Sequence, residues 1–124
     1  MIKDVDPVNA PQRLGNLLDE CLAACPDAVL ITAQLTPTTN ATATAFMNIF
    51  NPAIPGLAAS RVSAGKKVMT VDMRSYVNTT ELKDGLHPAD CGYNQMAIGW
   101  RDAIQQAISM GWITAPVDVN GLSS

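Results

Sequence analysis

The sequence is poor in the residues that bind metal ions. It has a single histidine, His87, and three cysteines among 124 residues, and no two cysteines are separated by two residues. A structural zinc site draws about four ligands from Cys and His side chains, usually in closely spaced pairs. We therefore expect no metal site, and the sequence indicates no cofactor.

The chain also lacks an excess of positive charge and long apolar runs. Its formal net charge is -3 and its pI is near 4.8, which leaves no basic surface for nucleic acid or an anionic membrane. No apolar run approaches the roughly 20 residues of a membrane span. Residues 1–6 lack the apolar core of a signal peptide. We expect neither nucleic acid nor a membrane as partner.

What is present suffices for one globular domain. Hydrophobic residues make up 48% of the chain and charged residues 15%, a composition that can bury a core at this length. Residues 112–124 are rich in Gly, Pro and Ser and show little periodicity. We predict a domain over residues 1–111 and a tail over residues 112–124 that is disordered at its end.

Three stretches have the apolar periodicity of helices. In the first, residues 9–24, Asn9 can cap the helix with Gln12 reaching back in a capping box. The second, about residues 42–64, must be kinked or divided by Pro52 and Pro55, because each proline removes a helical donor. The third begins at Pro88. The residues expected on the buried faces are Leu14, Leu17, Leu18, Cys21 and Leu22, then Phe46, Ile49, Phe50, Leu57 and Ala58, then Tyr93, Met96, Ala97, Trp100, Ile104, Ala107 and Ile108.

Two short apolar runs, residues 29–35 and 68–73, are typical of strands covered on both faces. The order helix, strand, helix, strand, helix predicts an α/β fold with a parallel sheet and flanking helices. The loop over residues 36–40 would leave the first strand at its carboxyl end, where open α/β sheets bind their ligands.

Asp84 and His87 are the candidate catalytic residues. An Asp three residues before a His can fold back through a turn containing Gly85 and accept a hydrogen bond from one imidazole nitrogen, which leaves the other nitrogen free to take a proton. Pro88 suits the first turn of a helix. His87 would then lie at a helix N-terminus, where the dipole disfavours the imidazolium that Asp84 favours. The alternative is that His87 only caps the helix or lies on the surface.

The run over residues 68–73, followed by residues 82–92 and then Met96, Ala97, Trp100 and Ile104, resembles the C-terminal block of the SGNH (GDSL-type) esterases. The resemblance is to carbohydrate esterases of acetyl xylan esterase type, and it extends upstream through residues 29–35. In that family a D-x-x-H-P motif supplies the catalytic Asp and His, which Asp84 and His87 match. The resemblance implies a three-layer α/β/α, flavodoxin-like sandwich, whose last two strands are those found here.

The family's nucleophilic Ser lies in a G-D-S motif, and an oxyanion Asn lies in a G-x-N-D motif; neither motif occurs here. None of the serines is preceded by Gly-Asp: Ser60, Ser63, Ser75, Ser109, Ser123 and Ser124. We therefore expect the C-terminal portion of an SGNH hydrolase that deacetylates carbohydrate or a similar small ester. The chain alone should be inactive. If the parent enzyme is extracellular, its signal peptide lies in the missing portion.

Two further expectations follow from this interpretation. A two-stranded sheet leaves the edge of the strand over residues 29–35 without a neighbour, so the chain could self-associate there. Two states of the cysteines remain open: either a disulfide joins Cys21 or Cys25 to Cys91, or all three cysteines are small buried side chains. The alternative function is a non-catalytic α/β fragment or interaction module, in which Asp84 and His87 only cap the last helix.

Overall fold

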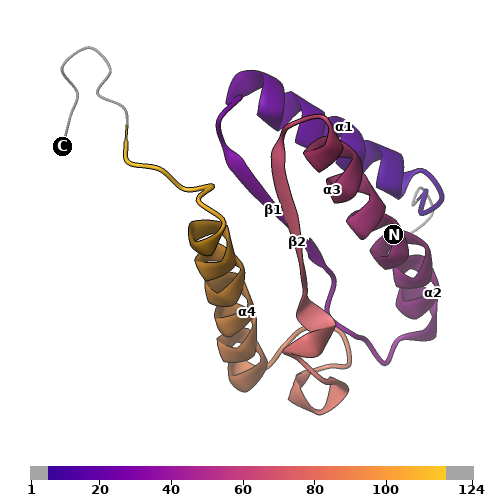
Figure 1. The fold of residues 1–124 in the computed structure, drawn as a ribbon. Helices are drawn as coiled ribbons and strands as arrows, with labels where there is room; N and C mark the ends of the chain where they lie inside the picture. The colour runs from indigo at the N-terminus through magenta and orange to yellow at the C-terminus, as the bar shows by residue number, and fades with distance from the viewer. Residues whose placement is uncertain (1–5, 117–124) are drawn as a thin grey trace.

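The computed structural model describes residues 6–116 and shows a two-stranded parallel sheet with helices on both faces (Figure 1). The elements in order are α1 (Ala10–Ala24), β1 (Val29–Gln34), α2 (Ala41–Phe50), η2 (Asn51–Ala53), α3 (Ile54–Ser63), β2 (Lys67–Asp72), η3 (Met73–Ser75), η4 (Thr79–Glu81) and α4 (Asp90–Ser109), where η marks a 3-10 helix. The α/β fold with a parallel sheet and flanking helices is confirmed.

The two strands pair in parallel from Val29 opposite Lys67 to Gln34 opposite Asp72. Successive side chains in a strand point to opposite faces. Leu30 and Val68 therefore pack with α1 and α3, whereas Ile31 and Met69 pack with α4. The sheet is thus buried on both faces, as its apolar sequence predicts.

The start of α1 differs from the expected capping box. Asn9 precedes the helix, but its side chain makes no capping hydrogen bond. Its backbone N–H and its side-chain amide instead donate to the Asp6 carboxylate, at 3.2 Å and 2.7 Å. The predicted capping box between Asn9 and Gln12 is wrong, because the Asp6 carboxylate already accepts from both the backbone N–H and the side-chain amide of Asn9. Leu18 and Leu22 are buried as expected, but Leu17 is exposed.

The two prolines divide the second predicted helix, as expected. Pro52 lies in η2, and Pro55 lies in the first turn of α3, where a missing N–H costs no helical hydrogen bond. Ala58 is buried and packs against Val68. The expected inward face of α2 forms only in part, because Phe46 and Phe50 are half-buried, Ile49 is exposed, and no residue of the helix is fully buried.

The last helix begins two residues later than expected. Pro88 forms an antiparallel bridge with Leu82, and α4 starts at Asp90 with Ala89 before it. Pro88 therefore continues an extended segment and does not open the helix. This correction moves His87 away from the first turn of α4.

The buried face of α4 matches the apolar pattern only in part: Ala107 is buried and Met96 packs against the core as expected. Its buried residues are small: Gly92, Gly99, Ala103 and Ala107. The large apolar residues Tyr93, Trp100, Ile104 and Ile108 are 53%, 36%, 45% and 56% exposed. Small residues let the helix lie close to the protein core, and a Cβ added at Gly99 would lie 3.0 Å from the Tyr76 ring.

After α4 the chain turns back onto the core. Trp112 donates its backbone N–H to the Ala107 carbonyl at 3.0 Å and packs against the cluster that contains Met69 and Val71. The predicted disorder at the end of the tail concerns residues 117–124, which lie outside the described residues.

Two other expectations can be compared with residues 6–116. No helix in this range has the length and apolar character needed to cross a membrane. Cys21, Cys25 and Cys91 all lie in the described range and are free thiols, so the disulfide to Cys91 is not formed.

Candidate active site

The candidate site is a small hairpin between η4 and α4. The bridge between Leu82 and Pro88 closes it, and the Lys83 N–H donates to the His87 carbonyl at 2.7 Å. At its tip the backbone reverses through Gly85, whose φ of 80° is readily adopted only by glycine. The hairpin therefore brings Asp84 and His87 to the same side of a tight turn.

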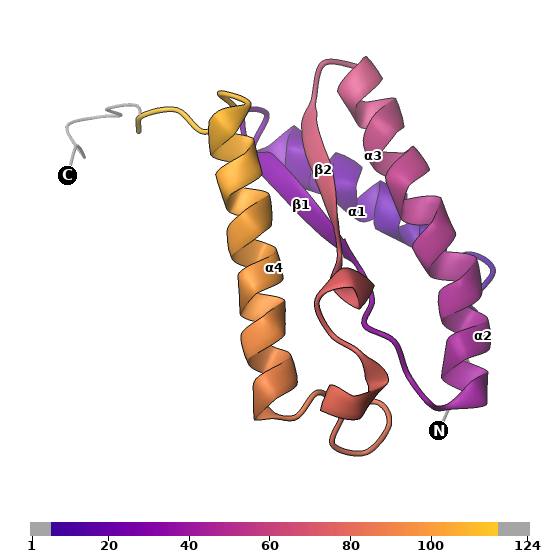
Figure 2. The same ribbon diagram turned by 60° about the horizontal axis from the view of Figure 1, so that its bottom comes forward.

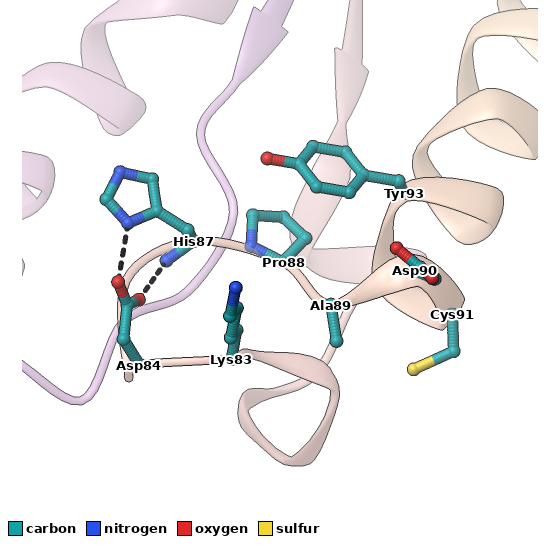
Figure 3. A pocket seen from close by; sticks show the side chains of 8 residues that line it. All are labelled: Lys83, Asp84, His87, Pro88, Ala89, Asp90, Cys91 and Tyr93. Atoms are coloured by element: carbon teal, nitrogen blue, oxygen red, sulfur yellow. Dashed lines mark hydrogen bonds and ion pairs between the residues drawn. The ribbon is translucent and has the colours of Figure 1, made fainter.

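Asp84 and His87 are in direct contact (Figure 3). The Asp84 Oδ2 atom lies 2.8 Å from the His87 Nδ1 atom. Asp84 Oδ1 accepts hydrogen bonds from the backbone N–H groups of Leu86 and His87, at 3.0 Å and 2.7 Å. The expected contact within hydrogen-bond distance is confirmed, and the carboxylate also fixes the turn that carries the histidine.

These hydrogen bonds change the acidity of Asp84. The backbone N–H of His87, followed by the His87 side chain and the Leu86 N–H, holds the pKa of the Asp84 carboxyl well below its usual range. Hydrogen bonds donated to a carboxylate stabilise its charged form. Asp84 is therefore ionised at neutral pH, as an acid that orients an imidazole must be.

The expected influence of the α4 dipole on His87 is not supported by the structure. The first helical residue, Asp90, is three positions after His87, and the dipole effect falls off within a helix turn. Asp84 is the charged group that contacts the imidazole. The local chemistry of the pair is thus that of a carboxylate and an imidazole, both more than half exposed.

The hairpin lies beyond the carboxyl ends of the two strands, and Figure 2 shows it below β2 and beside the base of α4. The loop that follows β1 reaches the same place, because the backbone N–H of Thr39 donates to the Gly85 carbonyl at 2.8 Å. The Asp84–His87 pair is therefore at the edge of the sheet where the sequence placed a ligand site.

An open cavity of about 780 Å³ lies against the pair. Its lining residues are Lys83, Asp84, His87, Pro88, Ala89, Asp90, Cys91 and Tyr93. The His87 ring nitrogen that does not contact Asp84 points away from the carboxylate, so it can reach another molecule (Figure 3). Lys83 and Tyr93 were not expected at the site. Tyr93 was assigned to the core from its helical spacing, and only its place in the first turn of α4 could have indicated otherwise.

Two kinds of group do not accompany the pair in residues 6–116. The cavity lining contains no serine, and Ser60 instead donates its hydroxyl to the Leu57 carbonyl within α3. Nor are three or more His, Cys, Asp or Glu side chains grouped there so that they could hold a metal ion. The chemistry that this part of the chain can supply is proton transfer by an oriented imidazole.

A parallel α/β sheet with an oriented histidine beyond its carboxyl edge is an architecture on which hydrolases place an Asp–His pair. Comparison with known proteins shows which hydrolases the chain resembles. No family model matches the chain. A solved structure described as a Clostridium thermocellum family 3 carbohydrate esterase is 28% identical, with a TM-score of 0.67 over 83% of this chain and 50% of that one.

Two further solved structures share the fold. A family 3 carbohydrate esterase from Talaromyces cellulolyticus is 22% identical, with a TM-score of 0.73 over 88% of this chain and 54% of its own. An acetyl esterase mutant crystallised with an acetate ion is 23% identical, with a TM-score of 0.74 over 88% of this chain and 53% of its own. Identities this low show the shared fold alone.

Among curated proteins, one of Acetivibrio thermocellus named "Putative endoglucanase X" is 32% identical over 90 residues, which are 70% of this chain and 38% of that protein. The chain thus spans well under half of this relative and about half of the solved esterases. The chain resembles the SGNH-type carbohydrate esterases of family 3 over most of its length, as its sequence indicated.

Proposed function

We propose that this chain supplies the general base and its orienting acid to an ester hydrolase that removes acetyl groups from carbohydrate. The observation that carries the proposal is the contact between Asp84 Oδ2 and His87 Nδ1 at 2.8 Å. The resemblance to family 3 carbohydrate esterases supports the choice of an acetylated carbohydrate as substrate.

In the proposed reaction His87 Nδ1–H donates to the Asp84 carboxylate, which fixes the tautomer and leaves Nε2 as the base. Nε2 takes the proton of a nucleophilic hydroxyl as that oxygen attacks the ester carbonyl. The resulting imidazolium is stabilised by Asp84, which stays ionised because its pKa is held low. The same proton then passes to the leaving sugar oxygen when the ester bond breaks, which leaves the acetyl group on the nucleophile. Nε2 next takes a proton from a water molecule that attacks this acetyl ester, and it returns the proton to the nucleophile oxygen as acetate departs.

The nucleophile and the oxyanion donors are not among the motifs of these 124 residues, since neither G-D-S nor G-x-N-D occurs. We propose that they come from a family-matched segment that would join this chain as the N-terminal half of the fold. Loss of the nucleophile of a serine hydrolase lowers turnover by about 10⁶. The 124 residues alone should therefore show no measurable hydrolysis.

The experiment adds that segment. Alone, the purified chain should neither hydrolyse a chromogenic acetyl ester nor be labelled by a fluorophosphonate probe. With an N-terminal segment that carries both motifs, turnover should appear, and His87→Ala should abolish it. Gln105→Ala, a substitution of an exposed side chain on α4, is the matched control and should leave turnover unchanged. Strong activity of the 124 residues that survives His87→Ala would show that other residues carry the chemistry.

The second candidate is a non-catalytic interaction module. The observation in its favour is the exposed apolar face of α4, which Tyr93, Trp100, Ile104 and Ile108 form. Under this alternative the added segment would bind the chain without producing turnover, and His87→Ala would leave that binding unchanged. The same experiment therefore separates the two functions.

A further inference from the structure

A second loop is attached to the hairpin that carries the Asp84–His87 pair. The Thr38 hydroxyl donates to the Gly85 carbonyl at 2.6 Å, and the Thr39 backbone N–H donates to the same oxygen at 2.8 Å. These residues are more than 45 positions apart in the sequence. The Thr39 hydroxyl also donates to this oxygen, at 3.4 Å, so the carbonyl at the tip of the hairpin is held by three donors from the loop between β1 and α2.

The donors are themselves held in place. The Thr38 hydroxyl oxygen accepts a hydrogen bond from the Asn40 N–H at 3.0 Å, and the Asn40 side chain caps α2 by accepting from the Ala43 N–H at 2.9 Å. The Thr38 hydroxyl thus has a donor and an acceptor partner at once. It joins the first turn of α2 to the hairpin.

The other end of the loop is fixed by a buried side chain. Asn51, 2% exposed, accepts from the Leu35 N–H at 2.8 Å and donates to the Leu35 carbonyl at 3.3 Å. The Gln34 amide donates to the Asn51 carbonyl at 2.9 Å. A buried and satisfied polar network of this kind specifies one geometry. The loop is consequently a rigid support, tied at both ends.

The approach between the two loops leaves no room for a side chain. A Cβ added at Gly85 would overlap the Thr39 hydroxyl oxygen. The turn residue next to Asp84 is therefore in contact with the support, and a shift of the support would shift Asp84. Because Asp84 and His87 are more than half exposed, packing around their side chains contributes little to their alignment.

We propose that Thr38 is a positioning residue for the Asp84–His87 pair: its hydroxyl holds the Gly85 carbonyl and so keeps the carboxylate aligned with His87 Nδ1. The proposal deepens the proposed function and rests on it, because alignment matters for turnover only if His87 is the base. Thr38 touches neither the imidazole nor the ester; it acts through Gly85 and Asp84.

The test reads the pair directly in the 124-residue chain. His87 is the only histidine, so its ring ¹⁵N signals are unambiguous and report which nitrogen of the neutral imidazole carries the proton. Thr38→Val keeps the shape but loses the hydroxyl, whereas Thr38→Ser keeps the hydroxyl. Asp84→Asn serves as the reference for a pair without its carboxylate.

We expect the wild type and Thr38→Ser to hold the proton on Nδ1 and to share one Asp84 carboxyl ¹³C titration curve. In Thr38→Val the Nδ1–H fraction should fall toward that of Asp84→Asn, and the pKa of Asp84 should rise toward its ordinary value. Thr38→Ala, which adds no methyl group in place of the hydroxyl, should behave like Thr38→Val and replaces it if that variant does not fold.

A folded Thr38→Val or Thr38→Ala chain with the wild-type tautomer and the wild-type Asp84 titration would overturn the proposal. A loss of alignment in Thr38→Ser equal to that in Thr38→Val would also overturn it, because the hydroxyl would then not be the cause. Neither readout requires hydrolysis. A failure of the esterase assay would therefore not decide whether Thr38 positions the pair, and a failure of the Thr38 prediction would not decide whether the chain serves an esterase.

Discussion

At the scale of single residues, Asp84 organises the site through local hydrogen bonds. Its two carboxylate oxygens interact with the backbone of Leu86 and with both the backbone and the ring of His87. The hydrogen bonds to the backbone close the turn, and the contact with the ring orients the imidazole. One side chain thus couples the stability of the hairpin to the chemistry of the pair.

This coupling predicts a dependence of stability on pH. The pKa of Asp84 is lowered in the folded chain, so Asp84 contributes stability that is fully present above its unfolded value of about 4 and is lost as the pH falls through the lower folded value. We expect Asp84→Asn to lose less stability than the wild type between pH 7 and pH values below about 4. Urea unfolding midpoints at a series of pH values measure this difference.

The matched control for this prediction is Asp27→Asn, because Asp27 is exposed and, within residues 6–116, its side chain makes no hydrogen bond or ion pair. It should follow the wild-type pH dependence closely. If the Asp84→Asn chain lost stability toward acid as steeply as the wild type, the hydrogen bonds to the carboxylate would not be stabilising the hairpin in solution.

The residue scale also shows what sequence reasoning can find. The contact between Asp84 and His87 could be predicted because both residues lie in one short segment around a glycine, so local geometry is enough. The support that Thr38 gives to Gly85 could not, because it joins segments more than 45 residues apart. Nothing in the spacing of Thr38 indicates which carbonyl its hydroxyl will meet.

At the scale of elements, α4 shows why apolar periodicity was misleading. The pattern indicates which residues are large and apolar, whereas close approach of a helix to its neighbours requires small ones. Gly92, Gly99, Ala103 and Ala107 recur at spacings of seven, four and four and form the buried face. The strands were predicted to within a residue at their ends, because both faces of the narrow sheet are covered and the apolar runs are unbroken.

Close packing of Gly92 gives a prediction at this scale. A Cβ at position 92 would lie 2.8 Å from the Glu81 carbonyl oxygen and 2.8 Å from Pro88 Cβ, which belong to the segment that frames the hairpin. Backbone cannot move as easily as the end of a side chain. We expect Gly92→Ala to lower the free energy of unfolding by about 1–3 kcal/mol, the usual cost of overpacking.

Gly56→Ala is the matched control, since Gly56 also lies in a helix but an added Cβ there would meet nothing within 4 Å. It should raise the free energy of unfolding by about 0.4–1 kcal/mol, because alanine restricts the unfolded chain and fits the helix. Both changes can be measured by urea denaturation. A Gly92→Ala chain as stable as Gly56→Ala would mean that α4 does not approach the hairpin as closely as the structure shows.

At the scale of the whole molecule, two features lack a covering layer within residues 6–116. The sheet has two strands, so each strand has one edge without a paired neighbour. The α4 stripe, defined as Tyr93, Trp100, Ile104 and Ile108, faces outward. Open strand edges and apolar faces both favour association with another chain. The strand count predicts the open edge of β1, whereas the apolar spacing assigns the α4 stripe to the core, and the structure places this stripe on the surface.

The last prediction concerns this outward face. We expect the chain to self-associate as its concentration rises, because association removes the α4 stripe from water. The double substitution Ile104→Lys and Ile108→Lys should shift the concentration-dependent mass, measured by size-exclusion chromatography with light scattering, toward that of a single chain. Both positions are about half exposed, so the thermal unfolding of the variant should stay close to that of the wild type. A substitution that only unfolded the chain would instead increase aggregation.

The control carries the same added charge on the polar flank of the helix. Asn94→Lys with Gln105→Lys changes two exposed residues of α4, and it alters the net charge by the same two units as the test variant. If the α4 stripe drives association, this control should associate like the wild type. Equal dissociation of both double variants would assign the effect to charge repulsion. A wild-type chain with the mass of one copy at every concentration would show that the α4 stripe and the open edges do not suffice for association.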